Sequence, residues 1–143
     1  MTEDVHVRID VSKSSKYSKL NDDLSSIFYK RGQASIFIIA TCIGFYFRKR
    51  IPLPPGKGSS DLFITSTLGS GNSEKLWILK AIAISELGID SLKDFKNAIK
   101  VCQEYANFGI DYLYDIHEKS SDEVRDYTRM MKEIVDEKLN NGN

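Results

Sequence analysis

Residues 32–47 read GQASIFIIATCIGFYF, sixteen residues without a charge that lie between Arg31 and Arg48. A membrane span needs roughly 20 predominantly apolar residues. This run is shorter, and glutamine, serine, threonine and glycine dilute it. We therefore predict a buried core helix over residues 34–47 and no membrane partner, with a short interfacial anchor as the alternative.

The residues on either side of this run define where the helix begins and ends. Lys30, Arg31 and Gly32 break the chain before it. The cations at residues 48–50 follow it, where positive charge is favourable against the negative end of the helix dipole. Three prolines then prevent continuation, and the glycines and serines of residues 56–60 favour a mobile connection.

The first thirty residues predict a strand and a short helix. Residues 5–11, VHVRIDV, alternate apolar and polar side chains, and this period of two is typical of a strand. A polar, serine-rich stretch follows, and we predict a helix over residues 17–29. Its apolar stripe is Tyr17, Leu20, Leu24, Ile27 and Phe28.

The segment after the prolines predicts one more strand and two helices. Residues 62–68, LFITSTL, have the composition of an edge strand or a hairpin arm. Ser73 is suited to cap a helix that ends before Gly88. The next helix begins at residue 90 or 91 and reaches a kink or tight joint at residues 107–109.

The last segment predicts a charged amphipathic helix. Residues 120–123, SSDE, resemble a capping box. We expect the inward face of this helix to carry Val124, Tyr127, Met131, Ile134 and Val135.

The predicted fold class is mainly α: a compact bundle of about five helices with a short N-terminal strand and a possible small β-hairpin. The length suits one domain over residues 1–143. We divide it into an N-terminal strand or arm at residues 1–16, a helical core at 17–119 and the C-terminal helix at 120–143.

Composition and charge bound the function as well as the fold. A hydrophobic fraction of 41% and a charged fraction of 28% are near globular averages, which argues against wholesale disorder. Residues 1–60 hold ten Lys and Arg against five Asp and Glu, which gives +5. Residues 61–143 hold ten against fifteen, which gives −5. This split suggests a surface that faces a polyanion, or head-to-tail self-association; solvated faces of differing composition are the plainer alternative.

Cysteine usage and the first residues indicate a reducing compartment. Cys42 and Cys102 lie in apolar helical patterns without Cys-x-x-Cys spacing, so we expect buried free thiols. The first ten residues, MTEDVHVRID, do not resemble a signal peptide. We expect a cytoplasmic protein.

No catalytic constellation is visible in the chain. An enzyme needs convergent groups such as a nucleophile with a base, and only His6 and His117 supply imidazoles. Asp115 and His117 point about 200° apart on a helix, so they do not form a local metal site. Residues 56–60, GKGSS, lack the first glycine of a phosphate-binding loop. We expect no enzyme activity, metal or cofactor.

The remaining candidate site is basic. Lysine and arginine bind nucleic acid chiefly by neutralising phosphates, which requires clustering more than fixed geometry. The predicted nucleic-acid-binding residues flank the core helix and are Lys30, Arg31, Arg48, Lys49, Arg50 and Lys57. Solubility and helix capping are the alternative explanation.

The order strand–helix–helix over residues 5–47 also resembles that of ribbon-helix-helix regulators. In those proteins a strand pairs across a dimer and places side chains in the major groove. The outward residues here would be His6, Arg8 and Asp10. The long linker and the apolar second helix argue against this alternative.

Six segments resemble a family of small proteins encoded alongside DNA phosphorothioation (Dnd) systems, the phosphorothioation-associated protein 4 family. They are, in chain order, Tyr29-Lys30, Ala40, Gly44-Phe45, Arg48-Lys49-Arg50-Ile51-Pro52-Leu53, Ala83-Ile84-Ser85-Glu86-Leu87-Gly88 and Glu104-Tyr105-Ala106-Asn107-Phe108-Gly109-Ile110. The chain departs from the family pattern at Phe108, where a small residue is expected, and in its longer tail. The small DndE subunit of these systems is a weaker likeness.

The resemblance implies an accessory role in a DNA modification or restriction defence system, and it supplies no catalytic residue. We therefore predict a non-catalytic, DNA-associated accessory protein that forms a homo-oligomer and contacts other defence-system proteins. The alternative is a protein–protein adaptor or assembly subunit, in which the amphipathic helix over residues 121–139 docks a larger partner or a second copy.

Overall fold

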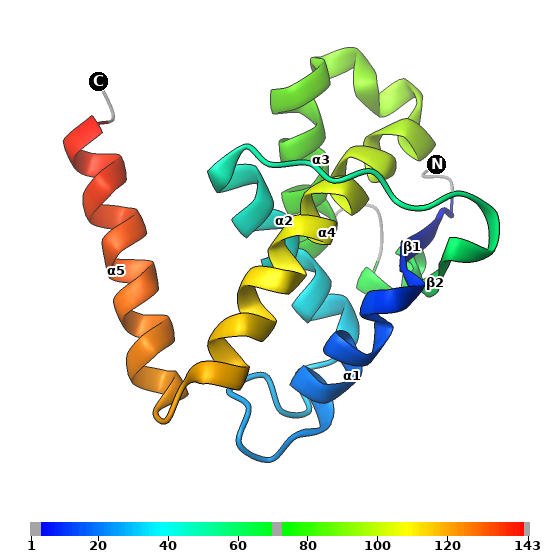
Figure 1. Ribbon diagram of the computed structural model, residues 1–143. Coiled ribbons are helices and arrows are strands. Elements are labelled where there is room, and N and C mark those ends of the chain that lie inside the picture. Colours follow the sequence, from blue (N-terminus) through cyan, green and yellow to red (C-terminus); the bar gives the residue numbers. More distant parts are fainter. Residues whose placement is uncertain (1–3, 70–72, 142–143) are drawn as a thin grey trace.

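The computed structural model describes residues 4–69 and 73–141. Within them, five α-helices and two short strands follow one another in the order β1-α1-α2-β2-α3-α4-α5 (Figure 1). Their bounds are β1 His6–Asp10, α1 Ser14–Asp22, α2 Gln33–Phe47, β2 Ser59–Ile64, α3 Glu74–Leu87, α4 Phe95–Lys119 and α5 Glu123–Asn141. Short 3-10 turns lie at Val11–Lys13, Gly56–Gly58, Thr65–Leu68 and Ile89–Lys93. The predicted mainly helical fold with a small β element is confirmed.

The uncharged helix α2 is the centre of the core, as its sequence predicts. Ile36 and Phe37 have no exposed surface, and α4 crosses directly over α2 (Figure 1). The crossing is close because two glycines lie at the contact: Gly44 faces the backbone of Tyr105, and Gly109 faces the backbone of Ala40. Small residues let two helix backbones approach where larger side chains would hold them apart.

Helix α4 is continuous, so the predicted kink at residues 107–109 is wrong. The helix runs unbroken from Phe95 to Lys119. Gly109 permits the close crossing rather than a bend. The start of α4 also differs from the expected residue 90 or 91: Asp94 caps it by accepting a hydrogen bond of 3.2 Å from the Asn97 N–H.

The two strands pair antiparallel although about fifty residues separate them, so they do not form a local hairpin. His6 lies opposite Ile64 and Asp10 opposite Ser59. The inward side of β1 is buried, as the alternation predicts. The Arg8 N–H donates to the Gln103 side chain of α4 at 2.8 Å. Because β1 is paired within its own chain, the arrangement does not fit a ribbon shared by two protomers.

Helix α1 is shorter than predicted. It ends at Asp22, and Asp23 adopts an extended conformation. The Asp23 carboxylate accepts hydrogen bonds from the Ser25 N–H and hydroxyl at 3.0 and 2.9 Å. This side-chain turn competes with the helix, and it leaves Leu24 80% exposed instead of on the buried stripe.

The helix ends of the second half follow local chemistry. Ser73 caps α3 by accepting a hydrogen bond of 3.2 Å from the Leu76 N–H, and Gly88 follows the helix at a φ of 94°. Asp122 caps α5 through the Arg125 N–H at 3.2 Å. The expected capping box is therefore only partly correct, because the Glu123 carboxylate turns toward His117 instead.

The thiols are free, but only one is buried. Cys102 is buried, as expected, whereas Cys42 lies on the outward side of α2 and is exposed. Within the described residues, no helix has both the length and the apolar character needed to cross a membrane.

Candidate functional site

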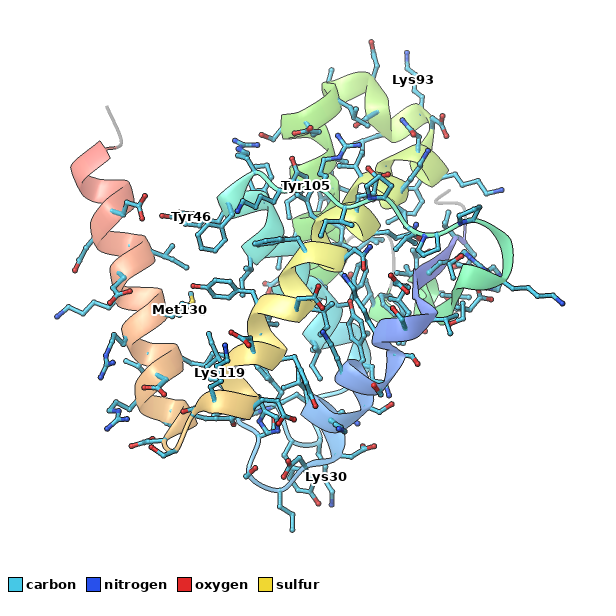
Figure 2. The ribbon with its side chains drawn as sticks, viewed as in Figure 1. Lys30, Tyr46, Lys93, Tyr105, Lys119 and Met130 are labelled. Carbon is cyan, nitrogen blue, oxygen red and sulfur yellow. The ribbon has the colours of Figure 1, made fainter. Side chains whose placement is uncertain are left out.

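The six predicted nucleic-acid-binding residues do not form one patch: five flank α2 at its two ends, and Lys57 lies in the turn that precedes β2. Lys30 and Arg31 precede α2, and residues 48–50 follow it. A helix of fifteen residues is about 22 Å long at a rise of 1.5 Å per residue. Figure 2 shows Lys30 at one end of the molecule, far from Tyr46 and Tyr105 near the other group.

Arg50 is held inside an ionic network. Its guanidinium donates to the Glu104 carboxylate at 3.0 and 2.6 Å and to Glu86 at 2.9 Å. Glu104 is only 9% exposed, and the Tyr105 hydroxyl donates to Glu86 at 2.7 Å. The hydrogen bond from Tyr105, followed by that from Arg50, lowers the pKa of Glu86. Arg50 therefore ties the turn after α2 to α3 and α4.

Arg48 and Lys49 remain at the surface. Arg48 ends α2 in the left-handed conformation, with a φ of 55°. Its guanidinium lies 4.1 Å from the centroid of the Phe45 ring and 3.8 Å from Glu86. The Lys49 ammonium lies 5.3 Å from the centroid of the Phe108 ring. Such cation–π contacts hold the side chains near the surface without burying their charge.

The other three predicted residues are also exposed. Lys30 has a φ of 58°, and its ammonium lies 5.3 Å from the centroid of the Tyr29 ring. Arg31 is exposed beside it, and Lys57 lies in the 3-10 turn that leads into β2.

Part of the charge split between residues 1–60 and residues 61–143 is neutralised within the molecule. The ammonium groups of Lys13 and Lys16 lie 2.8 and 2.6 Å from the Asp111 carboxylate. Arg8 lies 2.6 Å from Asp61. Desolvation raises the pKa of Asp111, but the hydrogen bonds and charges of the two lysines outweigh it and lower the pKa. The basic first part and the acidic second part thus attract each other across the core.

Helix α5 contacts the rest of the protein through one seam. The seam residues are spaced i, i+4, i+7 and i+11 and are Glu123, Tyr127, Met130 and Ile134. The Tyr127 hydroxyl donates to the Leu113 carbonyl at 2.7 Å, and its ring packs edge-on against Phe28 at 5.4 Å. In Figure 2, Met130 lies between α5 and the body, and Tyr46 of α2 points toward α5.

A second apolar stripe on α5 faces solvent. Each of its residues directly follows a seam residue in the sequence. They are Val124, Thr128, Met131 and Val135. The exposed fractions are 65% for Val124, 52% for Met131 and 51% for Val135. The predicted inward face is therefore wrong for these three residues and correct for Tyr127 and Ile134. The predicted inward face combined residues of the buried seam and of the exposed stripe, which lie about 100° apart on the helix. It did not include Met130.

Charged residues cover the remaining surface of α5 in two bands. The band next to the exposed stripe holds Arg125, Arg129, Lys132 and Asp136. The band beyond it is wholly acidic and holds Asp122, Asp126, Glu133 and Glu137. The exposed stripe is thus bordered by the buried seam on one side and by cations on the other.

The base of α5 is fixed by a buried histidine. His117, with a side chain 6% exposed, contacts Glu123 through Nδ1 and lies 3.0 Å from Asp23 through Nε2. Glu123 also accepts a hydrogen bond of 2.8 Å from the Ile27 N–H. Burial lowers the pKa of His117, but the bonds and charges of Glu123 and Asp23 outweigh it and raise the pKa. No sequence spacing could reveal this cluster, because Asp23 lies 94 residues away.

The described residues also form a hollow between α4 and α5. Among residues 4–69 and 73–141, no cluster of three or more His, Cys, Asp or Glu side chains is placed to hold a metal ion. The hollow has a volume of about 280 Å³ and is lined in part by Ile116, Asp126 and Arg129. Asp126 is held there by the Ser120 hydroxyl at 2.5 Å.

Comparison of the chain with protein-family models, with curated proteins and with solved structures gave no match. The fold and the site define a mainly helical domain with an outward-facing apolar stripe. The likeness to phosphorothioation-associated proteins stays a prediction.

Proposed function

We propose that this protein is a non-catalytic interaction module that docks a helix of another protein on the exposed stripe of α5. The carrying observation is the alignment of Val124, Met131 and Val135 along one line, each at least half exposed. Exposed apolar side chains scattered singly are ordinary, but a contiguous apolar surface is typical of a binding site.

The anchoring of α5 supports this role. Tyr127 and Met130 hold the helix against the body, and His117 fixes its first turn. The stripe is therefore presented on an ordered helix rather than on a free tail. Burying it against a partner helix would release further hydrophobic free energy, at about 25 cal/mol per Å² of apolar surface. Recognition of one helix by an apolar surface of another is a common mode of protein binding.

Site-specific photo-crosslinking followed by purified binding tests this function. A photoreactive residue at position 131 should form an adduct with a specific protein in cells, whereas one at the exposed position 96 should not. The captured protein is then purified, and its affinity for wild type and for Met131→Asp/Val135→Asp is measured. We expect the double variant to bind at least about tenfold more weakly, since two apolar contacts become charged. Equal affinities would refute the docking role.

DNA association is a second proposal, favoured by the exposure of the predicted cations, of which only Arg50 is bound by two carboxylates. Lys30, Arg31, Arg48, Lys49 and Lys57 reach solvent, and the family resemblance supports a DNA-linked role. Two of them precede α2, two follow it and Lys57 lies in the turn before β2, so each location contacts few phosphates. We expect weak binding with a shallow dependence on salt, because each phosphate contact contributes about 0.9 to the logarithmic salt slope.

Fluorescence anisotropy with a duplex of about 20 base pairs, at low and moderate salt, tests the DNA proposal. Arg48→Ala/Lys49→Ala and Lys30→Ala/Arg31→Ala separate the two ends of α2. Arg125→Ala/Lys132→Ala removes the same charge elsewhere and is the matched control. Binding that is absent, or unchanged in both first variants, would rule out these residues as the DNA contact.

A further inference from the structure

Resting on the proposed docking function, we propose that the partner of α5 is an acidic amphipathic helix. The stripe of Val124, Thr128, Met131 and Val135 supplies the apolar contact. Two cations, Arg125 and Lys132, border it on its solvent side, against the single anion Asp136, and Arg129 lies farther round the helix, where it lines the hollow beside α4.

The cations beside the exposed stripe determine which charge the partner helix should carry. In paired helices, residues flanking the apolar seam meet across the interface and select the partner by charge. Only the cationic side of the stripe can meet a partner, because the other side is the seam buried by Tyr127 and Met130. Glutamate or aspartate beside the partner's apolar seam would pair with Arg125 and Lys132.

A second copy of this chain fits the border poorly. If two α5 helices paired antiparallel through their stripes, Arg125 of each copy would meet Lys132 of the other. Like charges facing each other destabilise helix pairing. Arg125 lies 3.4 Å from Asp126 of its own helix, but this surface pair is screened by solvent and leaves Lys132 without relief from the acidic band on the far side of the stripe. The border therefore selects a different protein over self-association.

The dimensions of the stripe indicate a short and transient contact. Val124 and Val135 are eleven residues apart, which corresponds to about 17 Å of helix. A partner helix of about three turns covers this length. Interfaces of this small size are typical of transient rather than obligate complexes.

Designed peptides test the charge of the occupant with the intact protein. The probe is an amidated peptide of about 18 residues, long enough to form a helix, with leucine along one seam and glutamate at the flanking positions. Its control carries lysine at every glutamate position. Anisotropy titrations should show the acidic peptide binding at least about tenfold more tightly than the basic one, with the difference reduced by salt.

Charge reversal of the border supplies the decisive comparison. In Arg125→Glu/Lys132→Glu the preference should invert, so that the basic peptide binds more tightly. Lys96→Glu/Lys100→Glu makes the same charge change on the exposed side of α4 and should keep the wild-type preference. All four positions are exposed, so circular dichroism should show unchanged folding in both variants.

The peptide titrations distinguish a wrong partner charge from a failure of the docking function itself. If both peptides bind equally and Met131→Asp weakens both, the docking function stands and the acidic partner is wrong. If Met131→Asp changes neither, the docking function fails as well. Sedimentation that shows a stripe-dependent dimer would replace the acidic helix with a second copy, and stripe-dependent binding to phosphatidylserine vesicles without peptide binding would replace it with a membrane surface.

Discussion

Gly109 of α4 lies directly against the backbone of Ala40 of α2. A Cβ atom at position 109 would lie 2.6 Å from the Ala40 carbonyl carbon, and one at position 44 would lie at the same distance from the Tyr105 carbonyl carbon. Both distances are far inside van der Waals contact. The two glycines therefore set the separation of the helices that form the core.

Replacing either glycine with alanine should destabilise the fold. An exposed helical Gly→Ala change is favourable by about 1 kcal/mol, but here the added methyl meets backbone that cannot rotate away, and overpacking of this kind costs about 1–3 kcal/mol or more. We expect Gly109→Ala and Gly44→Ala each to lose about 2 kcal/mol in urea unfolding. Asn97→Ala, exposed on α4, is the control and should stay near wild type. Wild-type stability in both glycine variants would mean that the helices are not in this contact.

Removing Arg50 should destabilise the protein more than removing its partner Glu104. Arg50→Ala leaves Glu104, only 9% exposed, without its main partner, and an uncompensated buried charge costs about 3 kcal/mol. Glu104→Ala leaves Arg50 partly exposed and still paired with Glu86, so we expect a smaller loss of about 1–2 kcal/mol, since solvent screens the exposed cation.

A double-mutant cycle in urea measures this coupling. The Arg50→Ala/Glu104→Ala protein should be no less stable than Arg50→Ala alone, because both charges are removed together. Arg48→Ala removes an exposed arginine from the same turn and should change stability by about 0.5 kcal/mol or less. Additive losses in the double variant would contradict the pairing.

The sequence predicts the helices well because their signals are local. The uncharged run of α2, the Ser73 cap and the Gly88 end of α3 each act within one helical turn, and each is found where expected. The boundary of α1 was missed because the Asp23 side-chain turn outcompetes the helical pattern that continues to Phe28.

The site was harder to predict because it depends on contacts between distant residues. The cations around α2 look like one cluster in sequence, but the length of the helix separates them, and Arg50 meets Glu104 fifty-four residues later. On α5 the apolar pattern was visible, yet two adjacent stripes carry it. Only the position of Phe28 and Leu113 determines that Tyr127 faces inward and Val124 outward.

The two thiols should differ in reactivity. Cys42 is exposed, and partial desolvation raises its pKa. Full burial raises the pKa of Cys102 to about 12, and its Sγ lies 3.5 Å from the Leu79 carbonyl oxygen. A thiol reagent should therefore modify one cysteine in the native protein and both in urea, because the thiolate is the reactive form. Cys42→Ser should leave no native reactivity. Two reactive thiols in the native state would show that the core around Cys102 opens.

His117 should make the anchoring of α5 depend on pH. It lies among Glu123 of α5, Asp23 of the loop after α1 and the Tyr114 ring of α4, and the two carboxylates raise its pKa above 6.5 despite burial. A group with a raised folded pKa binds its proton more tightly in the native state. Its contribution is therefore complete below about pH 6.5 and is lost as pH rises through the folded pKa.

The measurement compares unfolding free energies between pH 6 and pH 9 for wild type, His117→Gln and His6→Gln. Wild type and His6→Gln should lose stability over this range in parallel, and His117→Gln should lose less. Amide hydrogen exchange at Ile27 and in the first turn of α5 should accelerate with the same pH dependence, beyond the intrinsic exchange rate, because these amides depend on the Glu123 contact. A His117-dependent gain in stability with rising pH would instead mean that the imidazole is neutral when buried, and that the carboxylates do not hold it as a cation.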